Sequence, residues 1–412
     1  MNLLTVEQAL GRILSHFQPV KTESVPLTES NNRVLAVDVV AADDLPLFDN
    51  SSMDGFALRA TDSSNAAPAS RVTLRVVADI PAGSSPAVSL EPGEAARIMT
   101  GAPLPQGADA VVPVEDTDFN DRVAGSAAPE QVQIEKPVRS GENVRPHGMD
   151  VHKGDVVLHK GRRLNAQSLG VLAMIGYAEV EVYQRPRVAL FSSGDELLPV
   201  NAPLEPGKIR DSNSYMLAAL IESTGAEVLR LGVAKDSHDS VKGLLEKAVT
   251  QIADLILSSA GVSVGAYDFV KEVIESNGAL DFWRVNMRPG KPLAFGDYQN
   301  IPFIGLPGNP VSAFVGFEVF VRPTLGRLGG LSEGGRPTIR VRCEQEILSD
   351  GRESYLRAIL RPGGENGLQI AKLTGHQGSG NLLSLVQADA LLIVPAGVKC
   401  VPAGQEVNAW LL

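Results

Sequence analysis

The sequence predicts a multidomain α/β protein: a central domain with a mostly parallel sheet, an N-terminal region that carries an inserted β-rich part, and a C-terminal β domain. First, the chain has 412 residues, more than one ordinary core needs, because domains usually run to about 100–200 residues. Second, residues 188–259 alternate apolar strand-like runs with helical segments, which is typical of a parallel sheet with crossover helices. Third, both flanks show short alternating runs broken by Gly, Pro and Asn, which indicates β structure.

We expect an N-terminal region at 1–184 with the β-rich subdomain inserted at about 43–150, a central α/β domain at 185–328 and a C-terminal β domain at 329–412. Near the start, Thr5 and Gln8 form a capping-box pattern before an amphipathic segment that runs to about Phe17, which predicts a helix. The sequence Arg185-Pro186-Arg187 marks one boundary, and the glycine-rich break at 329–335 marks the next.

The central domain is predicted in order as strand 188–192, helix 212–223, strand 227–233, helix 240–252 and strand 255–259. In such sheets ligands bind at the carboxyl ends of the strands. In the last domain we expect strands at 338–343, 355–360, 368–371 and 391–394, and no helix.

Charge and composition exclude several classes of protein. The 37 basic and 48 acidic residues give a net charge of −11, so we expect no nucleic-acid binding, and local cations must hold any anionic ligand. The longest uncharged stretch, 298–317, contains Pro302, Pro307 and Pro310, which argues against a membrane span. Residues 1–7 show no signal-peptide pattern, so we expect the cytoplasm. Cys343 and Cys400 are expected to be buried reduced thiols.

Four loops at strand ends or rigid turns carry residues suited to binding. They are Ser193-Gly194-Asp195-Glu196, the stretch 258–265 with Asp268 after it, Arg288-Pro289-Gly290-Lys291-Pro292, and Gly305-Leu306-Pro307-Gly308-Asn309-Pro310. Carboxylates on flexible loops suit a hard cation such as Mg²⁺, and hydroxyls with backbone amides can cradle an oxyanion. Tight turns use the same residues, so each loop alone is explained equally well by turn geometry. Four converging loops favour an anionic ligand.

Other polar segments carry weaker signals. The stretches 49–55, 97–103 and 139–145 are explained by turns alone, and Asp236 is read as a helix-approach or cap residue. The histidines show no ligand spacing, which argues against zinc. Neither G-x-S-x-G nor a P-loop occurs.

Six motifs, in order along the chain, resemble those of the molybdopterin molybdenumtransferases, which are the bacterial MoeA family and the related C-terminal part of gephyrin. They are Ser51-Ser52-Met53-Asp54-Gly55-Phe56-Ala57, Ile98-Met99-Thr100-Gly101-Ala102-Pro103, Gly194-Asp195-Glu196-Leu197, Gly261-Val262-Ser263-Val264-Gly265, Pro289-Gly290-Lys291-Pro292 and Leu306-Pro307-Gly308-Asn309-Pro310-Val311-Ser312. The similarity runs from about Leu14 to about Ser379 and covers nearly the whole chain.

The resemblance implies insertion of molybdate into adenylylated molybdopterin, with release of AMP, assistance by Mg²⁺ and molybdenum cofactor as product. It implies a MogA-like central domain, an elongated N-terminal region and a β-barrel-like C-terminal domain. It further implies an elongated homodimer whose clefts combine the β-rich lobe of one subunit with the central domain of the other. Molybdopterin adenylyltransferase and other cofactor-biosynthesis proteins are implied as partners.

The resemblance also implies roles for individual residues. The residues with implied catalytic roles are Asp54, Thr100, Asp150, Glu196, Asp236 and Asp268. Of these, Glu196 and Asp268 are the implied metal ligands. Substrate binding falls on Arg145, Ser193, Gly194, Gly261, Ser263, Gly265, Arg288, Lys291, Pro307, Gly308 and Asn309.

Three positions depart from the family pattern. Ala260 stands where the family commonly has glycine, so a positive φ there would strain the loop by about 1 kcal/mol or more. Ala266 replaces a common acidic residue, and we expect weaker metal or nucleotide binding. Arg288 replaces a common lysine and keeps the charge with a different geometry.

Two alternative functions remain open. The first is a carrier or scaffold that binds finished cofactor without turnover, which the changes at Ala260 and Ala266 favour. The second is pterin adenylyltransfer, which would consume ATP with metal-free molybdopterin; the β-rich lobe and the C-terminal domain argue against it.

Overall fold

The protein is described by a computed structural model that covers residues 3–119, 126–260, 269–332, 334–363 and 367–412. The chain divides into two compact units. Unit 1 contains residues 1–37, 160–173 and 177–412, and unit 2 contains residues 38–159 and 174–176. The domain boundaries expected from the sequence stay predictions.

Unit 1 begins with α1 (Val6–Ser15), which has the expected capping box between Thr5 and Gln8. Its apolar face buries Val6, Ala9 and Ile13 in the core of the central domain. Strand β1 (Thr22–Pro26) pairs antiparallel with β11 (Glu179–Tyr183). Between them in sequence are η1 (Leu27–Glu29) and α2 (Ala166–Met174).

The central sheet has six strands in the order β15 (Glu227–Ala234), β12 (Arg187–Ser193), β16 (Leu255–Ser259), β20 (Ile301–Leu306), β19 (Pro292–Tyr298) and β17 (Gly278–Arg284). The first four strands are parallel, and β19 and β17 are antiparallel additions. A small parallel pair, β13 (Leu197–Leu198) and β14 (Ile209–Arg210), lies after β12 in the chain. The mostly parallel sheet expected from the sequence is confirmed.

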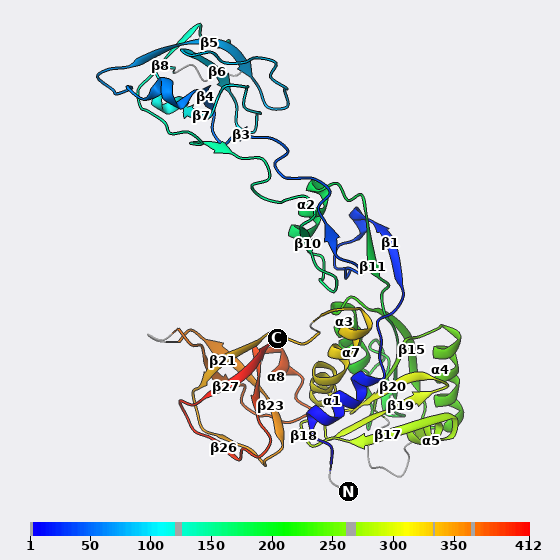
Figure 1. Ribbon diagram of the computed structural model, residues 1–412. Coiled ribbons are helices and arrows are strands. Elements are labelled where there is room, and N and C mark those ends of the chain that lie inside the picture. The colour runs from blue at the N-terminus through cyan, green and yellow to red at the C-terminus, as the bar shows by residue number, and fades with distance from the viewer. Residues whose placement is uncertain (1–2, 120–125, 261–268, 333, 364–366) are drawn as a thin grey trace. The chain divides into compact units, whose positions relative to one another are not determined.

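Both faces of this sheet are covered by helices (Figure 1). Successive residues of a strand point to opposite faces, so Val188 and Leu190 join one core while Ala189 and Phe191 join the other. The first core also takes residues of α1, α3 (Asn213–Ser223), α6 (Pro310–Gly316), η4 (Phe317–Val321) and α7 (Arg322–Leu328). The second takes residues of α4 (His238–Thr250) and α5 (Phe269–Asn277).

The C-terminal domain is a closed five-strand barrel, confirming the barrel-like prediction. Its strands follow the order β23 (Glu353–Arg361), β24 (Ile370–Leu373), β21 (Thr338–Cys343), β27 (Glu406–Leu411) and β25 (Ala390–Val394), and pairing of β25 with β23 closes it. Closure leaves no free sheet edge. The short β18 (Met287–Arg288) pairs parallel with β23, which fixes the loop from 288 onwards beside the barrel. The C-terminal domain also contains a separate two-stranded antiparallel sheet, formed by β22 (Ile347–Leu348) and β26 (Cys400–Val401).

Two expectations for this domain are wrong. A four-residue helix, α8 (Leu383–Val386), forms where no helix was expected; one turn is too short to show helical periodicity in a sequence. Cys343 is buried as expected, but Cys400 is exposed, because it lies on the short β22–β26 pair rather than on a barrel strand.

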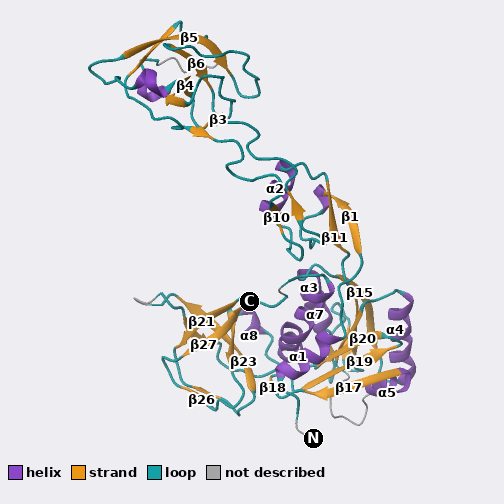
Figure 2. Cartoon of the chain, viewed as in Figure 1, coloured by secondary structure: helices purple, strands orange, loops and turns teal. Residues whose placement is uncertain are grey.

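Unit 2 holds a five-stranded sheet in the order β7 (Ala110–Pro113), β4 (Gly55–Leu58), β6 (Glu94–Ile98), β5 (Val72–Ile80) and β8 (Gln131–Ile134). Two short antiparallel pairs accompany it: β3 (Asn50–Ser51) with β9 (Val144–Arg145), and β2 (Val39–Val40) with β10 (Val156–Leu158). The one-turn helices η2 (Ala60–Ser63) and η3 (Val114–Asp116) are its helical segments among the described residues. Figure 2 shows the predominance of strand and loop that the sequence pattern predicted.

Within the described residues, no helix is both long and apolar enough to cross a membrane.

Candidate functional site

A cavity of about 670 Å³ opens at the carboxyl ends of the parallel strands of the central sheet. Its lining comes from the loops after β12, β16 and β20 and from the start of α3, and it includes the predicted residues Ser193, Gly194, Glu196, Asp236, Pro307, Gly308 and Asn309. The structure therefore brings these seven residues together. Ligand cavities commonly measure about 300–1,000 Å³.

Carboxylates and hydroxyls form a hydrogen-bonded cluster at one side of this cavity. The Ser193 hydroxyl donates to Asp236 Oδ1 at 3.3 Å. The backbone N–H of Asp195 donates to Asp236 Oδ2 at 3.4 Å, and the N–H of Asp236 donates to Asp195 Oδ1 at 3.3 Å. Asp236 precedes Ser237, the actual N-cap of α4. The reciprocal bonds fix the loop after β12 against the loop after β15.

The side chain of Glu196 folds back over Gly194. Gly194 has a φ of +149°, which residues with a Cβ rarely adopt, and a Cβ built there would lie 2.3 Å from Glu196 Oε2 in its present position, so glycine is favoured. The close approach keeps the Glu196 carboxylate on the cavity lining.

Ala260 follows β16 with φ of +71°, the left-handed conformation that would favour glycine. The alanine methyl makes this conformation unfavourable by about 1–2 kcal/mol. Its backbone N–H donates to the Leu306 carbonyl at 3.0 Å, which holds the residue in place. The predicted residues Gly261, Ser263, Gly265 and Asp268, and also Ala266, lie outside the described residues.

A second cavity of about 340 Å³ lies between the loop at 288–292 and the barrel. Arg288 and Lys291 line it as predicted, together with Arg352 and Arg357, which sequence reasoning missed. The two cavities share Pro292, Asn309 and Ser312 in their linings, so they adjoin. Arg357 lies on β23, and Arg352 lies in the loop before it. No sequence signal marks these two arginines, because barrel closure and the pairing of β18 with β23 bring them to the cavity.

Arg357 is fully buried in the wall of this second cavity. Its Nε donates to Ser384 Oγ at 2.9 Å, and its Nη2 donates to the carbonyls of His376 and Gly378 at 3.3 and 3.1 Å. Its Nη1 has no partner among the described residues. A buried guanidinium with one unused donor nitrogen is suited to an anion.

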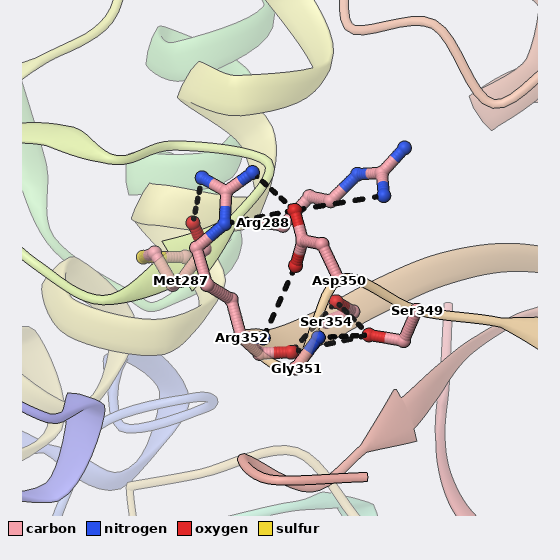
Figure 3. A network of polar contacts seen from close by, with 7 residues as sticks. All are labelled: Met287, Arg288, Ser349, Asp350, Gly351, Arg352 and Ser354. Carbon is pink, nitrogen blue, oxygen red and sulfur yellow. Dashed lines mark hydrogen bonds and ion pairs between the residues drawn. The ribbon is translucent and has the colours of Figure 1, made fainter. Parts of the chain in front are cut away.

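One carboxylate partly neutralises the positive charge of this cavity. Asp350 accepts hydrogen bonds from the Arg352 side chain, with an Nε–Oδ2 distance of 3.0 Å, and lies 3.8 Å from Arg288 Nη1. Figure 3 shows Asp350 between these two guanidinium groups. The hydrogen bond from Arg352 lowers the pKa of Asp350 to about 2. Lys291 makes no ion pair with any described carboxylate, so no described residue neutralises its charge.

The remaining predicted residues lie in unit 2. Asp54 Oδ1 accepts from the backbone N–H and the hydroxyl of Thr100, both at 2.7 Å, and the backbone bond holds the pKa of Asp54 below its ordinary value. Arg145 and Asp150 form an exposed ion pair. The structure thus joins the predicted residues of unit 2 in two pairs.

Metal binding by the described residues is limited. No group of three or more His, Cys, Asp or Glu residues among them could hold a metal ion. Mg²⁺, however, is often bound by one or two carboxylates together with substrate phosphates. Glu196 and Asp236, which line the larger cavity, fit that requirement.

Three family models together match most of the chain. They are described as the MoeA N-terminal region (domain I and II), matching residues 4–176, a probable molybdopterin binding domain, matching 189–327, and the MoeA C-terminal region (domain IV), matching 340–412. A molybdopterin molybdenumtransferase from Nostoc sp. is 42% identical over 394 residues, covering 94% of this chain and 88% of the relative. The chain belongs to the MoeA family.

Other MoeA relatives agree over the full length. A molybdopterin molybdenumtransferase from Haemophilus influenzae is 36% identical and covers 98% of both chains. The crystal structure of a molybdopterin biosynthesis MoeA protein from Pyrococcus horikoshii is 30% identical, with a TM-score of 0.83 and full coverage of both chains. Sequence similarity and fold therefore lead to the same family.

Proposed function

We propose that the protein is a molybdopterin molybdenumtransferase that inserts molybdenum from molybdate into adenylylated molybdopterin, with release of AMP and formation of molybdenum cofactor. The observation that carries the proposal is the adjoining pair of cavities, one lined by carboxylates and hydroxyls and the other by cations. The relatives named molybdopterin molybdenumtransferases support the same reaction.

The larger cavity is suited to the nucleotide-linked pterin. Its volume of about 670 Å³ accommodates a ligand of that size. Ser193 and Asn309 offer polar groups to the pyrophosphate, and Glu196 and Asp236 would hold Mg²⁺ against its oxygens. Bound Mg²⁺ would neutralise charge that develops on the phosphate oxygens during release of AMP.

The cationic cavity is suited to molybdate. Lys291 supplies a positive charge that no described carboxylate neutralises, and the buried Arg357 guanidinium adds positive charge in the cavity wall. Preorganised donors and charges stabilise an oxyanion more strongly inside a protein than in water. Since the two cavities share three lining residues, an oxyanion here would lie next to the ligand in the larger cavity.

The protein itself supplies no thiolate in this proposal. Neither Cys343 nor Cys400 lines either cavity, and the dithiolene sulfurs that receive molybdenum belong to the pterin. The described residues bind and orient the two anions, so we infer electrostatic positioning rather than covalent catalysis.

We further propose a homodimer in the cytoplasm, in which Asp54, Thr100, Arg145 and Asp150 act in the same reaction. Exposed apolar side chains accompany these residues in unit 2: Leu47 is 59% exposed and Met149 64%. The backbone N–H of Gly148 donates to the carbonyl of Pro46 at 2.9 Å, so the two segments that carry these side chains are neighbours. Neighbouring exposed apolar side chains are typical of an interaction surface. Molybdopterin adenylyltransferase is the partner that would supply the substrate.

The test is AMP release from adenylylated molybdopterin, measured by chromatography with and without molybdate and with Mg²⁺ added or chelated. We expect release that molybdate stimulates and that chelation abolishes. Binding of the pterin without molybdate-stimulated release would instead support a carrier or scaffold. ATP consumption with metal-free molybdopterin would support an adenylyltransferase.

A further inference from the structure

Asn213, the first residue of α3, makes contacts that sequence reasoning did not anticipate. Its side chain is 8% exposed, and the residue lines the larger cavity. Its Nδ2 donates to Ser259 Oγ at 2.8 Å and to the carbonyl oxygen of Gly308 at 2.7 Å. Ser259 ends β16, and Gly308 lies in the loop after the neighbouring β20. One amide group therefore connects the ends of two adjacent parallel strands at the cavity wall.

The orientation of this amide follows from its partners. A backbone carbonyl can only accept a hydrogen bond, so the group facing Gly308 must be the NH₂ group. Asn213 Oδ1 is then left buried, without a partner among the described residues. A buried acceptor without a partner is unfavourable for folding, so the contribution of the amide rests on the two bonds that Nδ2 donates.

Gly308 is held from a second direction by Ala260. A Cβ built on Gly308 would lie 3.2 Å from the Ala260 Cβ, so the alanine methyl packs against the glycine. The Asn213 bond fixes the carbonyl of Gly308, and the methyl limits movement of its Cα. The next residue, Asn309, lines both cavities.

We propose that Asn213 is a positioning residue that holds the loop 306–309 against the end of β16. It thereby keeps the position of one cavity fixed relative to the other. The inference deepens the proposed function, because it assigns alignment of the two substrates to a residue that need not touch either. Loss of the Asn213 bond would release the Gly308 carbonyl and let Asn309 move.

A ligand-free experiment tests the positioning directly. Hydrogen–deuterium exchange of a peptide covering 303–316 is compared among the wild type, Asn213→Ala and Asn277→Ala. Asn277 is the matched control, since its amide also donates to one backbone carbonyl, that of Val273, but lies in α5 on the other core. We expect faster exchange in the peptide for Asn213→Ala only. Unchanged exchange would overturn the proposal whether or not the protein turns over its substrate.

A second variant distinguishes positioning from a general loss of structure. In Asn213→Asp an ionised carboxylate faces the Gly308 carbonyl and repels it, whereas the protonated form can donate and restore the bond. Burial at position 213 raises the pKa of the introduced carboxyl, so its protonated fraction grows as the pH falls from 8 to 5.5. Equilibrium titration with adenylylated molybdopterin at pH 8 and pH 5.5 gives the ratio of the dissociation constants of Asn213→Asp and Asn213→Ala. Asp211, Glu196 and Asp236 also face this cavity, but both variants retain them, so their titration cancels in the ratio.

We expect the ratio to fall about tenfold from pH 8 to pH 5.5, with circular dichroism showing both variants folded; tenfold corresponds to about 1.4 kcal/mol. A ratio that does not change with pH would overturn the assignment. Failure of the wild type to release AMP would count against the proposed function and leave the exchange experiment valid.

Discussion

Replacement of Lys291 by methionine tests the cationic cavity with little structural disturbance. The ammonium group is exposed and makes no ion pair with a described carboxylate, so the variant loses a charge without breaking a salt bridge. Two unit charges about 4 Å apart attract by about 4 kcal/mol at an effective dielectric constant of about 20. Solvent screening of an exposed group reduces this to roughly 0.5–1 kcal/mol, which corresponds to a loss of about two- to fivefold.

The assay is AMP release as a function of molybdate concentration. For Lys291→Met we expect an about two- to fivefold higher KM for molybdate, calculated from these energies, and an unchanged urea midpoint. Lys242→Met is the matched control, because Lys242 lies on α4 and, among the residues that the structure describes, pairs only with Glu246; its KM should equal that of the wild type. Equal KM values for Lys291→Met and the wild type would refute the assignment of molybdate to this cavity.

Three further predictions concern single side chains. Asp350→Asn should lower the KM for molybdate a few-fold by freeing Arg352. The pKa of Asp350 is lowered to about 2, so its small contribution to stability is present above about pH 4 and is lost as the pH falls through 2. A difference in stability between the variant and the wild type that does not change with pH would contradict this. Glu318→Gln should destabilise the protein by about 3–5 kcal/mol in urea unfolding, since this buried carboxylate binds two arginines; a loss below 1 kcal/mol would count against it. Ala260→Gly should stabilise by roughly 0.5–1 kcal/mol by removing left-handed strain, and a lower unfolding free energy would show that the methyl contact with Gly308 matters more.

The sequence predicts the central domain well because its signals are local. Strand and helix alternate with clear periods, and the loops at strand ends carry Ser193, Glu196 and Gly308, all of which line the larger cavity. The motif resemblance found Arg288 and Lys291 for the same reason, since both belong to one short segment.

Residues placed by tertiary pairing could not be predicted in this way. Arg357 reaches the second cavity because it lies on a strand of the closed barrel, and Arg352 because β18 pairs with β23 beside it. Asn213 reads as an ordinary helix start, and only the fold shows that its amide connects Ser259 with Gly308. Cys400 was misjudged because a short peripheral strand pair resembles a buried strand in sequence.

The proposed function depends most on an oxyanion that binds beside the nucleotide-linked pterin, near Lys291 and Arg357. The most direct measurement is the anomalous diffraction of crystals soaked in tungstate, a heavier analogue of molybdate. We expect a peak in the 340 Å³ cavity, which Lys291 and Arg357 line, within hydrogen-bonding distance of the Lys291 ammonium. A fully occupied peak away from both side chains, with this cavity empty, would contradict it.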